Sequence, residues 1–149
     1  MTPSFAYLQM FTSPVFQKHL AIDVPIGKQL EIKMYDFSER VILQFLEYLY
    51  LQELREEVMK ETAVQLWGMA HKYMVPQLKE VVEEMVRSCL TVDNVICNTM
   101  RAEDHNARPI TEECLSFIVE NKKMLGDRSD FQILPNHLKL QLLEKLLRE

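Results

Sequence analysis

Apolar residues recur along most of this chain at the period of an α-helix. They return every three or four positions, which places them on one face of a helix. The stretches that show this period most clearly span about residues 36–50, 62–73, 76–86, 91–102, 111–119 and 135–147. Shorter helices are also expected near the amino terminus, one of them at residues 15–20 after Pro14. The pattern predicts seven or eight helices.

One segment alternates instead of following the helical period. Residues 30–34, with the sequence LEIKM, place apolar and polar side chains on opposite sides of an extended backbone. This is the one strand that the pattern supports. The predicted fold class is therefore mainly α, or α+β, with a helical core and a single short strand.

Polar residues and prolines mark the expected helix ends. Asp36, with Glu39 three residues later, is predicted to cap the helix that follows. Thr91 and Thr111 are predicted to cap two later helices, and Pro135 is predicted to begin the last one. Residues 121–130 are expected to form a charged loop. The inward face of the last helix is predicted to carry Leu138, Leu142, Leu143, Leu146 and Leu147.

Charge and composition exclude several classes of function. The net charge is −5 and the 17 basic residues are dispersed, which argues against binding to nucleic acid. No apolar run approaches the length of about 18 residues that a membrane span needs. Three cysteines match no zinc or disulfide pattern, and the first residues do not resemble a secretory signal. We therefore expect free thiols and an intracellular protein, cytoplasmic or nuclear.

Residues with catalytic or ligand-binding chemistry are scattered. The histidines, His19, His71, His105 and His137, have no metal-ligand spacing. The run from Glu103 to His105 is interpreted as a solvated helix end rather than an acid–base site. Cys89, Cys97 and Cys114 are expected to be buried, inert thiols, and Trp67 a core residue. No catalytic residue, metal, cofactor or small-molecule substrate is predicted, and the chain is not expected to be an enzyme.

An apolar loop is the main candidate for a binding surface. Residues 20–28 contain Pro25 and Gly27, which disfavour regular structure, so this segment is expected to lie at the surface. Its apolar members are Leu20, Ile22, Val24 and Ile26. Apolar side chains clustered on a surface mark interaction sites, and a packing role for them is the equally weighted alternative.

Several short strings, taken in order, resemble the BTB/POZ family. They are SPVF at residues 13–16, LEI at 30–32, FLEYLY at 45–50, AHKY at 70–73 with LK at 78–79, and CLTVDNV at 89–95. The tail from Asp130 to Leu143 is similar to the end of a BACK-type helix pair. The likeness covers roughly residues 5–147, and it implies a partial BTB/POZ domain over 1–90 followed by a BACK-like helical extension over 91–149.

The resemblance implies a function in protein–protein interaction. Many family members dimerise, and many connect a cullin ubiquitin ligase to a substrate-recruiting domain. The position of the family's cullin-facing surface adds Tyr50 and Leu51 to the candidate partner-binding residues Leu20, Ile22, Val24 and Ile26. The position of its dimer face corresponds to Phe5, Tyr7 and Leu8. The expected function is a substrate adaptor or regulator of a cullin-RING ubiquitin ligase.

The sequence departs from the family pattern in ways that support an alternative. Cullin-binding members carry an apolar-x-Glu motif in the loop that residues 20–28 match, and these residues include no Glu. The family's first helix and β-hairpin would precede Phe5, so the strand at 30–34 is expected to lack its usual neighbours. The alternative is a non-cullin scaffold, or a transcription-related protein, that dimerises with full-length BTB relatives and modulates them.

Overall fold

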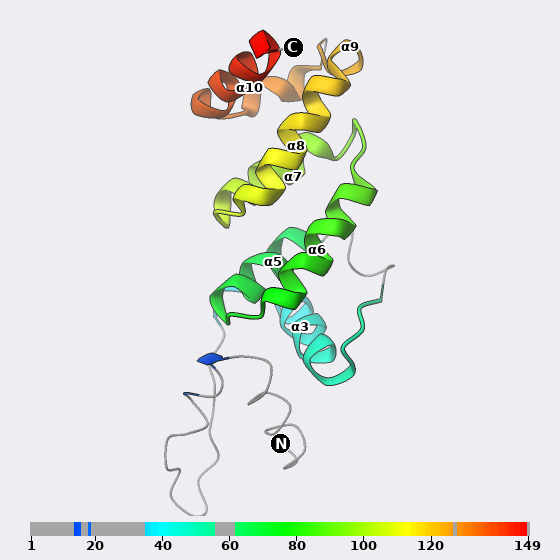
Figure 1. The fold of residues 1–149 in the computed structure, drawn as a ribbon, viewed down its shortest axis with the longest axis vertical. Coiled ribbons are helices and arrows are strands. Elements are labelled where there is room, and N and C mark those ends of the chain that lie inside the picture. Colours follow the sequence, from blue (N-terminus) through cyan, green and yellow to red (C-terminus); the bar gives the residue numbers. More distant parts are fainter. Residues whose placement is uncertain (1–13, 16–17, 19–34, 56–61, 127, 149) are drawn as a thin grey trace, which may run out of the picture. The chain divides into compact units, whose positions relative to one another are not determined.

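The described part of the chain is mainly helical, which confirms the predicted class. The computed structural model describes residues 14–15, 18, 35–55, 62–126 and 128–148 (Figure 1). Pro14, Val15 and Lys18 are helical, as the pattern near the amino terminus predicts. The strand expected at 30–34 lies outside the described residues. The chain divides into two compact units, 1–82 and 83–149.

The first unit is built on α3 (Glu39–Leu51), α5 (Ala63–Lys72) and the start of α6 (Pro76–Cys89). Helix α3 begins after Ser38, whose hydroxyl oxygen accepts a hydrogen bond from the Val41 amide at 3.4 Å. The prediction that Asp36 caps this helix is therefore wrong. The Asp36 carboxylate instead forms an ion pair with Lys72 on α5, so a contact distant in sequence takes the side chain away from the helix end.

Helix α5 is buried almost all round. Its predicted inward residues are confirmed, because Ala63, Leu66, Trp67, Ala70 and the following Tyr73 are all buried. Val64 and Met69 are buried as well, so α5 has little solvent-facing surface. A helix covered on this many sides forms the centre of its unit. Helix α3 packs directly against it.

The second unit contains the end of α6, a helical hairpin and a shorter helical tail. The hairpin joins α7 (Val95–Asp104) to α8 (Arg108–Glu120), and these two helices make the most extensive helix–helix contact in the described chain. Next come α9 (Lys122–Leu125), the 3₁₀ helix η1 (Ser129–Ile133) and α10 (Asn136–Arg148). Both α9 and α10 pack on α8.

Three predicted features of the second unit are wrong in detail. Thr91 does not cap α7: its hydroxyl accepts from the Asn94 amide in a turn, and α7 begins at Val95. Helix α8 begins three residues before Thr111, because Pro109 occupies a first-turn position where its missing amide hydrogen has no cost. The loop expected at 121–130 contains α9 and the first residues of η1.

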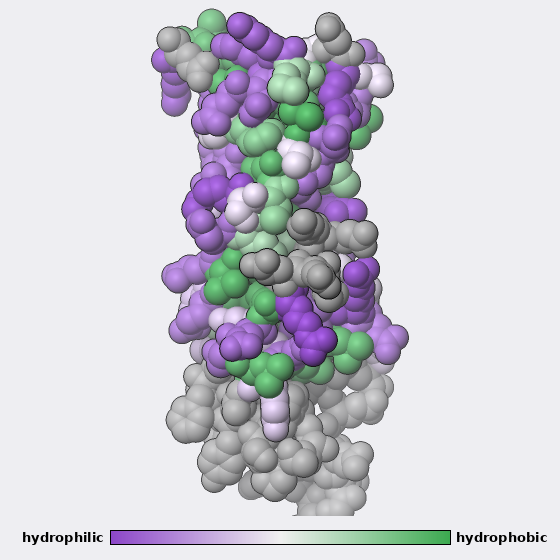
Figure 2. Space-filling model, turned by 90° about the vertical axis from the view of Figure 1, so that its right-hand side faces the viewer, coloured by the Kyte–Doolittle hydropathy of each residue, from purple (hydrophilic) through white to green (hydrophobic). Residues whose placement is uncertain are grey.

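The predicted inward face of α10 is only partly correct. Leu138 and Leu142 are buried against the rest of the unit, but Leu143, Leu146 and Leu147 are exposed. Leucines occupy six positions around this helix, so the apolar pattern does not define a single face. Leu143, Leu146 and Leu147 therefore lie at the surface of the second unit. Figure 2 shows further hydrophobic residues, in green, between hydrophilic ones near the top of the view.

Candidate protein-interaction surface

An exposed apolar face runs along α3 and ends at its last turn. Leu43, Tyr50 and Leu51 are 58%, 50% and 53% exposed. Leu43 and Tyr50 are seven residues apart, which places them on the same side of the helix two turns apart. Glu47 lies between them and forms an ion pair with Arg55 at 3.1 Å. We define the α3 face as Leu43, Glu47, Tyr50 and Leu51.

The carboxyl end of α3 is held in a defined conformation. Gln52 adopts a left-handed backbone with φ of 56°, and its amide donates to the Tyr48 carbonyl at 2.7 Å. Its side-chain amide donates to the Leu49 carbonyl at 3.3 Å. These bonds satisfy carbonyl groups that the helix end would leave open. Tyr50 and Leu51 are therefore displayed on an ordered last turn.

The opposite side of α3 is fixed to α5 by apolar and polar contacts. Phe45 is fully buried, and its ring centroid lies 5.6 Å from that of Tyr73. The Thr62 hydroxyl donates to Gln44 Oε1 at 2.6 Å in the same buried layer. Burial raises the pKa of the Tyr73 hydroxyl. This buried attachment lets the α3 face meet a partner without rearranging the helix.

Two of the predicted partner-binding residues can be placed, and both belong to this face. Tyr50 and Leu51 lie together on the last turn of α3, and half of each side chain is open to solvent. The other predicted binding residues, Leu20, Ile22, Val24 and Ile26, and the predicted dimer residues, Phe5, Tyr7 and Leu8, lie outside the described residues. Leu43 is not among the predicted binding residues, although its spacing of seven residues from Tyr50 was a signal for it.

Trp67 belongs to the core, as predicted. It is 2% exposed, and the His71 ring stacks on it with the planes 9° apart and the centroids 5.2 Å apart. The Lys79 ammonium lies 4.7 Å from the centre of the Trp67 ring, a cation–π distance. Helices α5 and α6 are joined by these contacts.

Residues 103–105, the candidate acid–base run at the end of α7, have different environments. Both carboxylate oxygens of Glu103 have partners, the Thr111 hydroxyl at 3.3 Å and His137 Nε2 at 2.8 Å. Asp104 is exposed, and His105 caps the helix end. Glu103 is therefore not the solvated residue expected, because it ties α7 to α8 and α10.

Glu103 and His137 also line a polar pocket of about 370 Å³. Arg108, Thr111 and Glu112 lie in the same lining. Glu112 pairs with Lys145 at 2.9 Å, so both carboxylates of the pocket are held by neighbours within the second unit. The pocket is therefore a polar contact region between α7, α8 and α10.

The three cysteines are free, but they differ in environment. Cys114 is buried, and burial raises the pKa of its thiol to about 11. Cys89 is half-buried. Cys97 is exposed, so the expectation of a buried thiol is wrong there. Cys97 follows the buried Ile96 directly on α7, and the hundred-degree step between helical neighbours carries it to the outer face.

The described ranges contain neither a metal-binding cluster nor a membrane-spanning helix. Within them, no three His, Cys, Asp or Glu side chains gather closely enough to hold a metal ion. Among the helices of that same part of the chain, none combines the length and the apolar character needed to cross a membrane.

Exposed apolar side chains gathered on an ordered helix are typical of protein modules that bind other proteins through their surface. The chain belongs to the BTB/POZ domain family, whose sequence pattern residues 7–90 match. BTB/POZ domains mediate protein–protein interactions, including dimerisation, and are generally not enzymes.

Curated relatives share this domain over most of the present chain. A BTB/POZ domain-containing protein of Arabidopsis thaliana is 30% identical over 129 residues, which cover 87% of this chain and 52% of the relative. BTB and MATH domain-containing protein 40 of Caenorhabditis elegans is 26% identical, covering 79% of this chain and 30% of that protein. BTB/POZ and MATH domain-containing protein 4 of A. thaliana is 27% identical, and the match covers 84% of this chain and 30% of that protein. The chain therefore spans about half or less of the length of these relatives.

Proposed function

We propose that this chain is an adaptor that binds the scaffold of a cullin-RING ubiquitin ligase. The observation that carries the proposal is the α3 face, a set of exposed apolar side chains on an ordered helix of a BTB/POZ domain. No bond chemistry is involved. The contribution of the chain would be to hold a partner protein beside the ligase.

The α3 face can supply part of the free energy of such a contact. Burying one large apolar side chain contributes about 1.5–3 kcal/mol. Leu43, Tyr50 and Leu51 are each at least half exposed, so each can supply part of that amount when a partner covers it. The preformed last turn of α3 reduces the entropy lost on binding. The apolar residues Leu20, Ile22, Val24 and Ile26 are proposed to extend this surface.

Residues 91–149, which lie in the second unit, are proposed to be a BACK-like extension. The support is the α7–α8 hairpin followed by α10, together with the likeness of residues 89–95 and 130–143 to that type of extension. Two of the relatives are named as containing a MATH domain besides their BTB domain. A substrate-recruiting function of the whole protein, in the cytoplasm or nucleus, is part of the same proposal.

Calorimetric titration with the N-terminal domain of a cullin tests the adaptor function. We expect saturable binding by the full chain, and a loss of at least about tenfold in affinity for Leu51→Asp, because a charge would be buried at the contact. Val24→Asp is expected to weaken binding as well. Leu140→Asp is the matched control, since it changes a similarly exposed leucine on α10. Equal affinity of Leu51→Asp and Leu140→Asp would show that the α3 face does not bind the cullin.

A second candidate function is a scaffold that pairs with other BTB proteins. It is favoured by residues 20–28, which contain no Glu where cullin-binding members have one. Its proposed contact residues are Phe5, Tyr7 and Leu8. Mixing the chain with a full-length BTB protein distinguishes the candidates. A mixed dimer that forms with no affinity for the cullin supports the scaffold, and cullin binding without a mixed dimer supports the adaptor.

A further inference from the structure

A second apolar surface lies on the other unit and is not used by the proposed adaptor function. An apolar groove of about 170 Å³ opens between α8, α9 and α10. We define it by the residues that line it, which are Ile118, Val119, Lys122, Leu125, Gly126, Phe131, Leu142 and Leu146. A cavity of about 150 Å³ is large enough to hold benzene. The groove therefore has room for one leucine or phenylalanine side chain.

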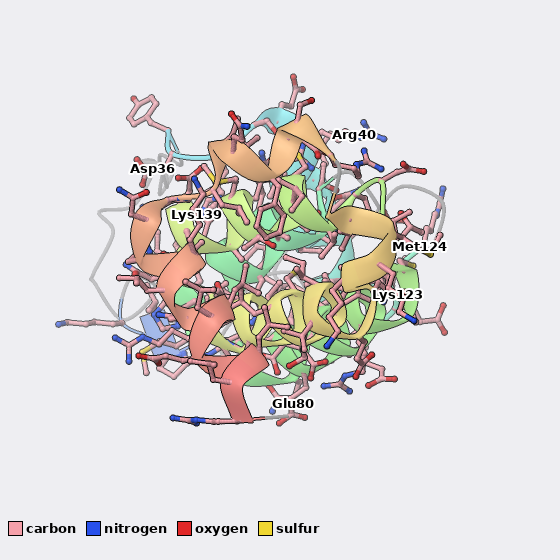
Figure 3. All side chains as sticks on the ribbon, turned by 90° about the horizontal axis from the view of Figure 1, so that it is seen from above. Asp36, Arg40, Glu80, Lys123, Met124 and Lys139 are labelled. Atoms are coloured by element: carbon pink, nitrogen blue, oxygen red, sulfur yellow. The ribbon has the colours of Figure 1, made fainter. Side chains whose placement is uncertain are left out.

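The floor of the groove is buried, and one of its walls is held by a hydrogen bond. Leu125 and Leu142 are buried and form its floor. The Lys139 ammonium donates to the Gln132 carbonyl at 2.8 Å, which holds η1 against α10 near the end of the groove. Figure 3 shows Lys139 close to the start of α10. The groove is thus a preformed feature.

Exposed apolar side chains continue from the groove onto the surface. Leu146, at the edge, is 36% exposed, and Leu143, which neighbours it on α10, is 55% exposed. These two leucines are three positions apart, so they lie on adjacent turns of one side of the helix. Met124 is exposed on α9. A partner segment seated in the groove would cover these side chains as well.

The lining of the groove contains one charged residue. This residue is Lys122, and Lys123 follows it on the exposed side of α9. Figure 3 shows Lys123 and Met124 projecting from α9 next to each other. A cationic rim around an apolar pocket attracts segments that carry acidic side chains beside an apolar one. A two-fold dimer through the groove would instead bring the lysines of both copies together, which opposes that occupant.

We propose that the groove between α8, α9 and α10 binds an acidic amphipathic segment of a partner protein, which inserts one leucine- or phenylalanine-sized side chain. The inserted side chain would rest on Leu125 and Leu142. Acidic side chains of the segment would face Lys122 and Lys123. This is a helix-in-groove mode of recognition, in which apolar anchors give affinity and flanking charges give selectivity.

Fluorescence anisotropy on the full chain tests the proposal. The probe is a labelled synthetic peptide of glutamate and leucine with its leucines at helical spacing, and a peptide with lysine in place of glutamate is the counter-probe. We expect the acidic peptide to bind at least about tenfold more tightly than the basic one, with affinity that falls as salt increases. No binding, or equal binding of the two peptides, would overturn the proposal.

Substitutions test whether the acidic peptide binds at the groove. We expect Leu146→Glu to weaken binding of the acidic peptide by at least about tenfold. We expect the same loss of affinity from the double change Lys122→Glu with Lys123→Glu. Leu140→Glu and Arg108→Glu are matched controls, because both residues are exposed and neither lines the groove. The lysine variant keeps the apolar floor intact, so it remains decisive if Leu146→Glu does not fold. Unchanged binding by the lysine variant would refute the assigned site.

Two further results distinguish the groove from the α3 face, and a partner protein from a second copy of this chain. Leu51→Asp on α3 is expected to leave peptide binding unchanged, so failure of the adaptor function does not affect this test. A chain that forms dimers in light scattering, and loses them on Leu146→Glu, would place a second copy in the groove and overturn the proposal.

Discussion

Single polar side chains decide how the helices of this protein meet. Gln44 and Thr62 are both buried and share a hydrogen bond of 2.6 Å between α3 and the start of α5. A buried polar group without a partner costs about 1–3 kcal/mol. This pair therefore favours one register of α3 on α5, in which the α3 face points outward.

The cysteines give a prediction at the same scale. Thiolate is the reactive form of cysteine, and a pKa of about 11 leaves only about one Cys114 in a thousand ionised at pH 8. Cys97 is exposed. We expect Ellman's reagent at pH 8 to modify Cys97 rapidly and Cys114 only when the protein unfolds. Because Cys89 is half-buried, the test uses a chain that already carries Cys89→Ser. Adding Cys97→Ser should remove the fast phase, and a fast phase that persists in the double variant would contradict the assignment.

At the scale of elements, the period of apolar residues predicts which segments are helical but not where each helix begins. Both Asp36 and Ser38 are residue types that cap helices, and Glu39, three residues after Asp36, makes Asp36 the locally favoured choice. The choice depends on Lys72, which lies 36 residues away and pairs with Asp36. At α7 the predicted cap, Thr91, is instead bonded to Asn94 in a turn that precedes the helix.

The cap of α3 can be tested by two matched substitutions. Ser38→Ala removes the hydroxyl that accepts from the Val41 amide, so the free energy of unfolding should fall by about 1 kcal/mol. Asp36→Ala removes only an exposed ion pair and should cost less than about 0.5 kcal/mol. Urea denaturation measures both values. A larger loss for Asp36→Ala would restore that residue as the cap.

The candidate surfaces were predictable to different degrees. Tyr50 and Leu51 could be selected from the likeness to a family, but their exposure depends on how α3 is fixed to α5. The groove between α8, α9 and α10 could not be predicted, because α10 has leucine at too many positions to show which side is buried. Only the packing of α10 on α8 selects Leu138 and Leu142 for the interior.

At the scale of the whole molecule, burial of ionisable groups links stability to pH. Burial raises the pKa of Tyr48 and Tyr73 in the first unit and of Cys114 in the second. The unfolded chain loses these protons near the ordinary pKa values of 9.0 and 10.0, whereas the native protein retains them. The unfolded state then binds fewer protons, so the free energy of unfolding decreases as the pH rises.

We therefore expect these three groups to leave the urea midpoint unchanged below about pH 8 and to lower it above about pH 9. Cys114→Ala should remove the earliest part of the decrease and leave the part due to the tyrosines. A midpoint that rises between pH 8.5 and pH 10.5, a range of about two units around the ordinary values, would contradict the assignment of these groups to the interior.

The central claim is that the chain acts by binding proteins through the α3 face. The most direct measurement is light scattering after size exclusion, on the chain alone and mixed with the N-terminal domain of a cullin. We expect a complex whose mass exceeds that of either component, and we expect Leu51→Asp to abolish it and Leu140→Asp to preserve it. A mixture that elutes as two separate species, with the chain at the mass it has alone, would contradict the account.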